Sequence, residues 1–297
     1  MAMAPGFDDA KRPICIAFIR ECLEAHRATG SNKPLVIGLN GVQGVGKTTL
    51  VTALEAALEA DGVPTLTCSI DDFYLTHEEQ AALARAHADN ALLQHRGAPG
   101  THDVPLAKSV FASLISRQPT ALPQYDKALF AGQGDRRPES CWKHVNRPQQ
   151  PPIEAVILEG WSVGFQSMTA QAVEARWKAP SRTLHRHKLE HLLFINDALE
   201  EYDGLTDLLD AFIHIDSDQV EYVYGWRQEQ EDSLRADKGD PSAGMTPEQV
   251  VRFVDGYVPS YELYTDRLRR GIFSDRPGRQ LRIVVNRDRS IRDVTRI

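Results

Sequence analysis

A glycine-rich stretch at residues 41–48 has the residue types that hold the phosphates of a nucleotide. Its sequence, Gly-Val-Gln-Gly-Val-Gly-Lys-Thr, fits the pattern G-x-x-x-x-G-K-[ST]. Glycines let backbone N–H groups converge on phosphates, the lysine reaches the β- and γ-phosphates, and the threonine hydroxyl can ligate Mg²⁺. We therefore predict a nucleoside triphosphate site here, rather than a chance glycine-rich turn, formed by Gly41, Val42, Gln43, Gly44, Val45, Gly46, Lys47, Thr48 and Thr49.

Carboxylates follow two other apolar segments. Asp71 and Asp72 come directly after residues 65–70, and Glu159 follows the apolar run 155–158. Open α/β sheets bind their ligands at the carboxyl ends of the strands, where a carboxylate can accept the proton of a substrate hydroxyl. We expect this role for Asp71, with Asp72 beside it, and we expect Glu159 to hold Mg²⁺ directly or through water. The alternative for both aspartates is that they cap a turn or a helix. The alternative for Glu159 is a structural role, in which its carboxylate hydrogen-bonds only to neighbouring groups at the strand end.

One arginine and three histidines also invite a functional interpretation. Arg227 lies on a predicted helix, from which it could stabilise charge on a transferring phosphate, or it could be an ordinary surface residue. The histidines are more typical of a solvated basic segment than of a metal site, because basic residues are interleaved and no cysteine is near them; they are His185, His187 and His191.

The elements that must position these side chains can be predicted from the same sequence. After the glycine loop, Leu50, Leu54 and Leu58 recur at the spacing of one helix face. Apolar runs typical of strands buried in a parallel sheet occur at residues 35–39, 65–70, 155–161, 211–216 and 281–286. Further helices are predicted at about 13–28, 78–94, 104–116, 192–209 and 218–237.

Another helix begins at Pro247, because Thr246 and Gln249 fit a capping box, and we expect a kink in it at Pro259. Strands thus alternate with helices along the chain. This order predicts an α/β fold of the P-loop NTPase type, with three α/β/α layers and a mostly parallel central sheet.

Residues 118–152 show little periodicity and many Pro, Gly and charged residues, so we expect a functional loop or a disordered segment there. We interpret residues 1–297 as a single domain with an N-terminal helix at about 13–29 and an irregular acceptor-site insertion at about 118–152.

The bulk composition narrows the class of protein. The chain has 297 residues, is 42% hydrophobic and carries a net charge of −7, which argues against general nucleic-acid or membrane-surface binding. Its four cysteines form no C-x-x-C pair, and we expect free thiols in a reducing compartment. The first 13 residues do not have the pattern of a targeting segment, and no apolar run could span a membrane. We therefore expect a cytoplasmic protein, and the sequence leaves its oligomeric state open.

An ordered set of motifs resembles the glycerate-kinase-like P-loop kinases of fungi and plants, within the phosphoribulokinase, uridine kinase and pantothenate kinase superfamily. The resemblance covers residues 33–290, almost the whole chain. Besides the phosphate loop, the motifs are S-I-D-D-F-Y-L-T at 69–76, R-G-x-P-G-T-H-D at 96–103, P-Q-Y-D-K at 123–127, L-E-G-W at 158–161 and W-R-x-x-Q-E at 226–231.

The resemblance implies roles for individual residues. It makes Asp71 the catalytic base, Glu159 an aid to Mg²⁺ binding and Arg227 a lid arginine that acts with Lys47 on the γ-phosphate. It also implies that Asp103 contacts substrate hydroxyls and that Tyr125 lines the acceptor pocket. The remaining acceptor-side residues that it implies, some as contacts for a carboxylate, are Asp72, Tyr74, Arg96, His102, Lys127 and Arg136.

The expected function is therefore an ATP- and Mg²⁺-dependent kinase that phosphorylates a hydroxyl of a small molecule, with D-glycerate as the best candidate. Residues 123–136 depart from the uridine kinase pattern, which argues against a nucleoside acceptor. Pantothenate, uridine and sugar acids other than glycerate remain alternative acceptors. A nucleotide-hydrolysing switch is the alternative of another class, although residues 286–289 do not complete an N-K-x-D guanine signature and no D-x-x-G follows the third strand.

Overall fold

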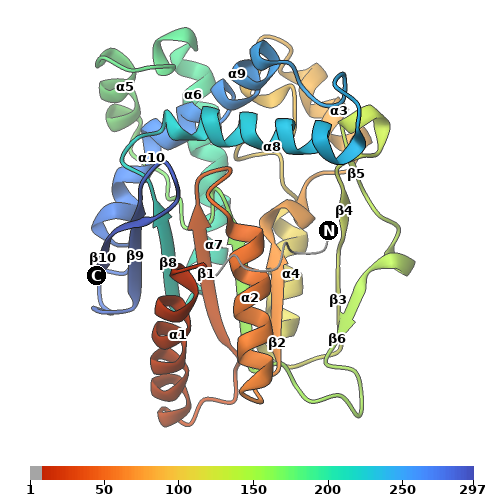
Figure 1. Ribbon diagram of the computed structural model, residues 1–297, viewed down its shortest axis with the longest axis vertical. Coiled ribbons are helices and arrows are strands. Elements are labelled where there is room, and N and C mark those ends of the chain that lie inside the picture. Colours follow the sequence, from red (N-terminus) through yellow and green to blue (C-terminus); the bar gives the residue numbers. More distant parts are fainter. Residues whose placement is uncertain (1–8) are drawn as a thin grey trace.

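A computed structural model of the chain describes residues 9–297; the N-terminal residues 1–8, where no targeting segment is predicted, lie outside the described residues. A six-stranded sheet has the order β10-β9-β8-β1-β7-β2 (Figure 1). Every neighbouring pair is parallel except β9 and β10. The strands are β1 (Leu35–Gly41), β2 (Thr65–Ser69), β7 (Ala155–Gly160), β8 (Ala211–Asp216), β9 (Gln280–Val285) and β10 (Ile291–Arg296). The fold is the predicted α/β architecture with a mostly parallel sheet.

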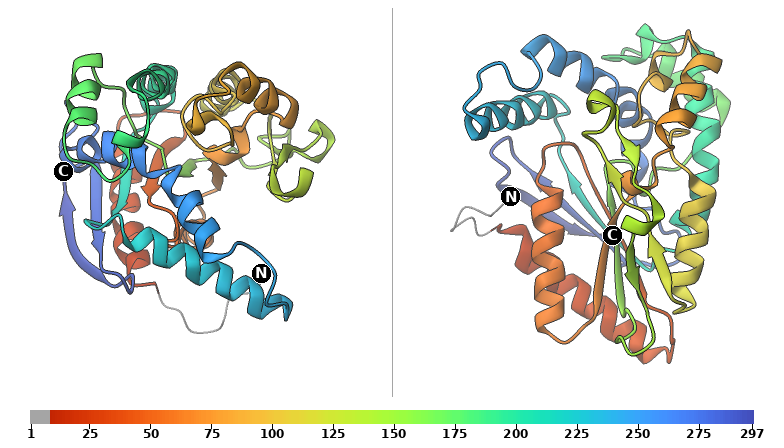
Figure 2. Two further views of the ribbon diagram at one scale, coloured as in Figure 1. Left: turned by 90° about the horizontal axis from the view of Figure 1, so that it is seen from above. Right: turned by 90° about the vertical axis from the view of Figure 1, so that its right-hand side faces the viewer.

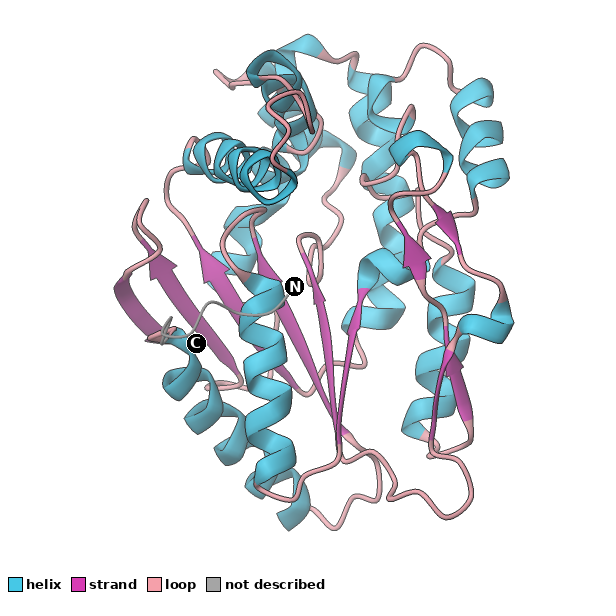
Figure 3. Cartoon of the chain, turned by 45° about the vertical axis from the view of Figure 1, so that its right-hand side comes forward, coloured by secondary structure: helices cyan, strands magenta, loops and turns pink. Residues whose placement is uncertain are grey.

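Helices cover both faces of this sheet. α1 and α2 pack on one face, and α4 and α6 lie on the other (Figure 2). The helices are α1 (Lys11–Ala28), α2 (Lys47–Ala60), α3 (His77–Ala86), α4 (Val104–Ile115), α5 (Ala170–Lys178), α6 (Leu189–Leu199), α7 (Asp203–Thr206), α8 (Tyr222–Lys238), α9 (Pro247–Asp255) and α10 (Val258–Arg270). The arrowheads of the parallel strands point to the end of the sheet where α8 and α9 lie (Figures 1 and 3).

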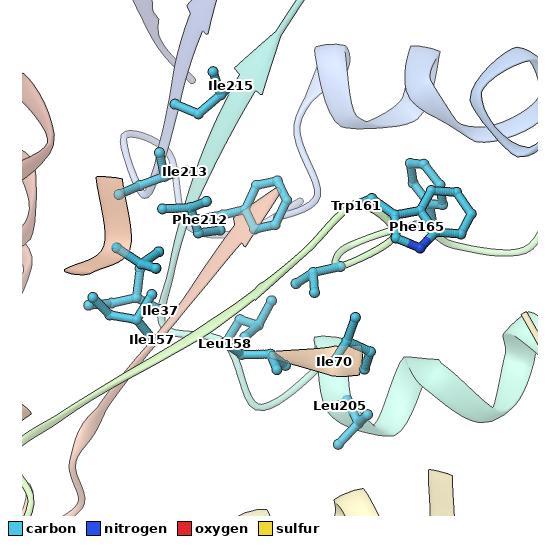
Figure 4. Close-up of a cluster of buried hydrophobic side chains, with 14 of the residues drawn as sticks. Ile37, Ile70, Ile157, Leu158, Trp161, Phe165, Leu205, Phe212, Ile213 and Ile215 are labelled. Atoms are coloured by element: carbon cyan, nitrogen blue, oxygen red, sulfur yellow. The ribbon is translucent and has the colours of Figure 1, made fainter. Parts of the chain in front are cut away.

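The core lies on both sides of the central strands. All residues of β1 and β8 are buried, which explains why their sequences are continuous apolar runs rather than alternating ones. Ile37, Ile157 and Phe212 belong to this core, and Trp161 and Phe165 extend it from the loop after β7 (Figure 4). Burial of each large apolar side chain stabilises the fold by about 1.5–3 kcal/mol, so this core holds the strand ends in fixed positions.

Two predicted helices are interrupted. The helix expected at 78–94 ends at Ala86, because Asn90 instead caps a short 3₁₀ helix, η2 (Ala91–Leu93), and the Gln94 amide donates to the carbonyl oxygens of His87 and Asn90 at 2.8 and 2.9 Å. The helix expected at 192–209 is divided into α6 and α7 by a second 3₁₀ turn, η6 (Glu200–Tyr202).

The C-terminal region differs from the prediction in two further ways. Pro259 does not kink one long helix: α9 ends at Asp255, and the proline lies in the first turn of α10, where its missing N–H leaves no hydrogen bond unmade. The chain also adds β10, an antiparallel edge strand. Most of its residues are exposed and polar, so it lacks the apolar run from which the other strands were predicted.

Residues 118–152 form two small antiparallel pairs instead of a structureless loop. β3 (Thr120–Leu122) pairs with β6 (Lys143–Val145), and β4 (Tyr125–Asp126) pairs with β5 (Asp135–Arg136). These strands are too short to be recognised by alternation of polar and apolar residues. The β3–β6 pair lies beside α4 (Figure 1), and the β4–β5 pair lies at the carboxyl end of β2, where the N–H of Tyr125 contacts Asp72.

Within residues 9–297, none of the helices combines the length and the apolar composition needed to cross a lipid bilayer.

Candidate active site

A cleft of about 1530 Å³ opens at the carboxyl ends of the parallel strands. Segments far apart in the sequence meet there: the loop between β1 and α2, the ends of β2 and β7, and the facing sides of α8 and α9. The predicted site residues that line it are Gln43, Gly44, Gly46, Lys47, Thr48, Thr49, Asp71, Tyr74, Arg96, Lys127, Glu159 and Arg227.

The glycine loop has a backbone that side chains would not permit. Gly44 and Gly46 have φ angles of +79° and +97°, in the left-handed region that glycine adopts without cost. A Cβ atom on Gly44 would also lie 2.5 Å from the Cβ atom of Trp226. Val42 and Val45 are buried beneath the loop and, with Gly41, do not line the cleft. Their predicted part in nucleotide binding is therefore confined to the backbone.

Lys47 begins α2 directly after the loop. Its ammonium group donates hydrogen bonds to the carbonyl oxygens of Gly41 at 2.8 Å and Val42 at 3.4 Å. Burial lowers the pKa of Lys47, while the nearby carboxylates of Glu159 and Asp71 act in the opposite direction. The N-terminus of α2 adds free backbone N–H groups and the positive end of the helix dipole. The combination suits a polyphosphate.

The two aspartates after β2 have different environments. They lie in the 3₁₀ helix η1 (Ile70–Phe73), which Ser69 caps. One carboxylate oxygen of Asp72 accepts from the N–H of Ser69 at 3.3 Å, and the other accepts from the N–H of Tyr125 at 3.2 Å. Asp72 does not line the cleft. Its geometry is that of the capping alternative, and it ties the β4–β5 pair to the end of β2.

Asp71 faces the cleft. Its Oδ2 atom accepts a hydrogen bond from the Lys127 ammonium at 2.6 Å. Its Oδ1 atom is buried and has no hydrogen-bond partner in the described part of the chain. Burial alone would raise the pKa of Asp71, but the Lys127 ammonium holds this pKa below the ordinary value. Asp71 is therefore ionised and presents one free oxygen as a proton acceptor.

Glu159 and Thr48 provide oxygen atoms on the other side of the loop. Glu159 lies at the end of β7 in register with Leu39 of β1 and Ser69 of β2. Neither its carboxylate nor the Thr48 hydroxyl forms an ion pair or hydrogen bond with any side chain or backbone group of residues 9–297. Carboxylate and hydroxyl oxygens are ligands that Mg²⁺ prefers, so this donor set fits the ion.

Arg227 is fixed on α8 rather than free on the surface. Its guanidinium forms an ion pair with the buried Glu231 and donates to Gln230 Oε1 at 2.8 Å. The same group lies over the Phe253 ring of α9, 5.1 Å from its centre. Glu231 also accepts from the N–H of Met245 at 2.7 Å, which links the α8–α9 loop to this cluster.

Several predicted acceptor contacts lie behind the cleft wall. His102 stacks on Tyr74 with 4.4 Å between ring centres and hydrogen-bonds to the Tyr202 hydroxyl at 2.7 Å. Burial lowers the pKa of His102 to about 4, so this histidine is neutral. Asp103 caps α4 and accepts from Arg136 at 3.0 Å. Together with Asp72, the predicted acceptor-side residues that do not line the cleft are His102, Asp103, Tyr125 and Arg136.

Arg96 does line the cleft and has no acidic partner among residues 9–297. Its guanidinium donates to the carbonyl oxygens of Gly132, at 2.8 Å, and Gln133. It also lies over the Tyr125 ring, 5.6 Å from the ring centre. Lys127 and Arg136, by contrast, pair with Asp71 and Asp103.

Comparison with known proteins places this geometry in a family. No family model matches the chain. An uncharacterized kinase of Schizosaccharomyces pombe is 37% identical over 239 residues, which are 80% of this chain and 83% of the relative. The structure of D-glycerate 3-kinase from Cryptococcus neoformans superposes with a TM-score of 0.87 at 35% identity, over 97% of this chain and 99% of that one. The chain belongs to the glycerate-kinase-like P-loop kinases.

The kinase is also similar to a plant protein. The chloroplastic D-glycerate 3-kinase of Arabidopsis thaliana is 35% identical over 263 residues, which are 86% of this chain and 54% of that relative. The chain thus spans about half the length of the plant relative. The family resemblance predicted from the motifs is confirmed, and the protein is an ATP-dependent kinase that acts on a small molecule.

The structure of the kinase adds residues that the motifs did not reveal. Asn40 at the end of β1 donates to the carbonyl oxygens of Trp161 and Val163 at 3.0 and 2.8 Å, which fixes the loop after Glu159. Tyr261 of α10 accepts from the N–H of Gln43 at 3.3 Å. In the sequence, Asn40 is visible only as a polar residue at the end of an apolar strand, and Tyr261 only as one member of a helix face.

Proposed function

We propose that this kinase transfers the γ-phosphate of ATP to a hydroxyl group of D-glycerate. The observation that carries the proposal is the free Oδ1 atom of Asp71, which belongs to an ionised carboxylate in the same cleft as Lys47. A nucleotide-hydrolysing switch also orients its attacking water with a polar side chain, so the response of ADP release to an added acceptor distinguishes the two functions. Two relatives named D-glycerate 3-kinase, one from a plant and one from a fungus, support the choice of acceptor.

The reaction assigns a separate task to each side chain. The glycine loop and the start of α2 bind the phosphate chain of ATP. Asp71 Oδ1 accepts the proton of the acceptor hydroxyl while that oxygen attacks the γ-phosphorus and ADP leaves. Lys47 and Arg227 neutralise charge on the transferring phosphoryl group. Thr48 and Glu159 would hold Mg²⁺, which supplies further charge neutralisation at the phosphates.

The free charge of Arg96 favours an acidic acceptor. Its guanidinium contacts carbonyl oxygens of the β4–β5 connection and the Tyr125 ring but no carboxylate of residues 9–297, so it can still receive the acceptor's carboxylate in a bidentate pair. Uridine would leave this cation without a partner. We propose that Arg96 binds the acceptor's carboxylate. The residues behind the wall, which are His102, Asp103, Tyr125 and Arg136, would then shape the pocket together with Tyr74, which lines the cleft. Asp72 would fix the β4–β5 pair beside it.

An assay of ADP release against a panel of acceptors tests this proposal. The panel is D-glycerate, L-glycerate, glycerol, pantothenate, uridine and ribulose 5-phosphate. We expect D-glycerate to give the highest kcat/KM and Lys47→Ala to abolish turnover. Arg96→Met should raise the KM for D-glycerate by about tenfold or more while the KM for ATP stays unchanged. The matched control is Arg85→Met, on α3 in the same cleft but on its exposed side.

Other outcomes of the panel would reject parts of the proposal. A preference for uridine or pantothenate would reject the glycerate assignment. ADP release that no acceptor stimulates would favour the switch. An unchanged KM for D-glycerate in Arg96→Met would remove that residue from the acceptor site.

We also propose that the protein functions in a reducing compartment, the cytoplasm. The support is that all four cysteines are free thiols, three of them buried. Fractionation of cells that express the tagged protein tests this proposal. Detection of the protein in a membrane or organelle fraction would contradict it.

A further inference from the structure

The turn between β9 and β10 reaches across to the phosphate loop. The Nε atom of Arg289 in this turn donates to the carbonyl oxygen of Gly44 at 2.8 Å. Its Nη2 atom forms an ion pair with Glu229 of α8 at 2.7 Å. The guanidinium lies over the ring of Trp226, 5.2 Å from the ring centre. One side chain therefore joins the phosphate loop to the helix that carries Arg227.

Trp226 completes this arrangement from the helix side. Its side chain is fully buried, and its indole N–H donates to the carbonyl oxygen of Arg287 at 2.6 Å. Its Cβ atom occupies the space next to Gly44 where any larger residue would place its own Cβ. We call Gly44, Trp226, Glu229 and Arg289 the loop clamp. It holds the loop, α8 and the β9–β10 turn together.

The clamp orients a peptide group of the phosphate loop. A trans peptide is planar, so the Gly44 carbonyl and the Val45 N–H point in opposite directions. Because Arg289 binds the carbonyl on the outer side, the Val45 N–H points to the inner side of the loop. There its only partner in the described residues is the Val42 carbonyl oxygen, at the long distance of 3.4 Å. The N–H is thus held in place for a stronger acceptor such as a phosphate oxygen.

The backbone of Arg289 indicates that its side chain is what matters at this position. Its φ angle is +66°, in the left-handed region that disfavours a residue with a side chain. Asparagine or glycine would adopt this conformation in a turn more easily. An arginine here is compatible with the fold because its guanidinium makes three contacts that those residues could not make.

We propose that Arg289 is a positioning residue for phosphoryl transfer. It does not line the cleft. It acts by holding the Gly44 carbonyl outward and α8 in place, so that the Val45 N–H and Arg227 are directed at the same phosphate chain. The proposal rests on nucleotide binding and not on the identity of the acceptor.

Substitution by asparagine separates this role from a contribution to folding. Asparagine would suit the backbone of this position better than arginine does, so Arg289→Asn should unfold within a few degrees of the wild-type Tm. We expect its Kd for ATP, measured by calorimetry without any acceptor, to rise about tenfold, with a lower kcat and an unchanged KM for the acceptor. Arg289→Lys keeps the charge but lacks the planar group that donates to the Gly44 carbonyl oxygen and to Glu229 at the same time. This variant should therefore restore only part of the affinity for ATP.

Two further variants complete the test. Arg287→Asn, which changes an exposed arginine in the same turn, is the matched control and should bind ATP as the wild type does. Glu229→Gln changes an exposed residue of the clamp and should weaken ATP binding by a smaller factor, even if Arg289→Asn fails to fold. An unchanged Kd for ATP in Arg289→Asn and Glu229→Gln, or equal losses in Arg289→Asn and Arg287→Asn, would overturn the proposal.

Discussion

Gly44→Ala is expected to damage nucleotide binding through a single methyl group. Two effects combine at this position. The φ angle of +79° costs an alanine roughly 1–2 kcal/mol. The new Cβ atom would lie 2.5 Å from the Trp226 Cβ atom, which is fixed to the backbone of α8 and cannot rotate away. Relief of such overpacking typically costs about 1–3 kcal/mol, so the loop must move away from α8.

If the loop moves away from α8, its backbone N–H groups no longer fit the phosphates, and the free energy of relieving the Cβ clash is lost from ATP binding. We expect the Kd for ATP to rise roughly 5- to 150-fold, the factor that corresponds to about 1–3 kcal/mol. Gly62→Ala is a matched control, because Gly62 has a φ angle of +76° in the turn after α2 and nothing within 4 Å of its Cβ position. That variant should lose stability by the backbone strain alone and bind ATP normally.

Calorimetric titration with ATP and urea unfolding of both variants give the two quantities separately. The reasoning is refuted if Gly44→Ala binds ATP as tightly as Gly62→Ala and unfolds at the same urea concentration. In that case the contact between the loop and α8 would not restrict the position of the loop.

Three other perturbations have definite expected outcomes. Lys127→Met should move the acid limb of the kcat/KM profile to higher pH, because the Lys127 charge then no longer counters the rise that burial causes in the pKa of Asp71, while Lys143→Met should not. Glu159→Gln should raise the Mg²⁺ concentration needed for half-maximal activity, and an unchanged Mg²⁺ titration would remove Glu159 from the metal site. Burial lowers the pKa of His214 to about 4. Below about pH 6.5 the unfolded chain therefore binds a proton that the folded chain resists, and this histidine alone should lower the free energy of unfolding by about 2 kcal/mol between about pH 7 and pH 5. His102, whose pKa burial also lowers to about 4, adds a loss of its own. Urea unfolding at both pH values measures the total change, and His214→Phe should reduce it by about 2 kcal/mol and leave the part due to His102.

The central fold was predictable because the sheet is parallel and covered on both faces. Burial on both sides makes β1 and β8 continuous apolar runs, which are visible without any partner strand. β10 was missed because an exposed edge strand has no apolar requirement. The split at Pro259 was also missed, since a proline after an apolar helical pattern is compatible with a kink or with the first turn of a new helix.

The nucleotide side of the site was more predictable than the acceptor side. Residues 41–48 form one continuous loop whose chemistry depends on local backbone geometry, and the motif specifies that geometry. The acceptor side depends on which side chains are already paired. The carboxylate of Asp103 is occupied by Arg136 and by the start of α4, whereas Arg96 has no acidic partner in the described chain, and no spacing in the sequence distinguishes these cases.

Phosphorus NMR of the reaction mixture tests the central claim most directly. Wild-type protein with ATP, Mg²⁺ and D-glycerate should produce one phosphoglycerate for each ADP formed. Asp71→Asn should lower kcat by a factor on the order of 10² or more while the Kd for ATP stays unchanged. Release of inorganic phosphate in place of a phosphate ester, or wild-type turnover in Asp71→Asn, would contradict the proposal that Asp71 delivers the acceptor hydroxyl to the γ-phosphate.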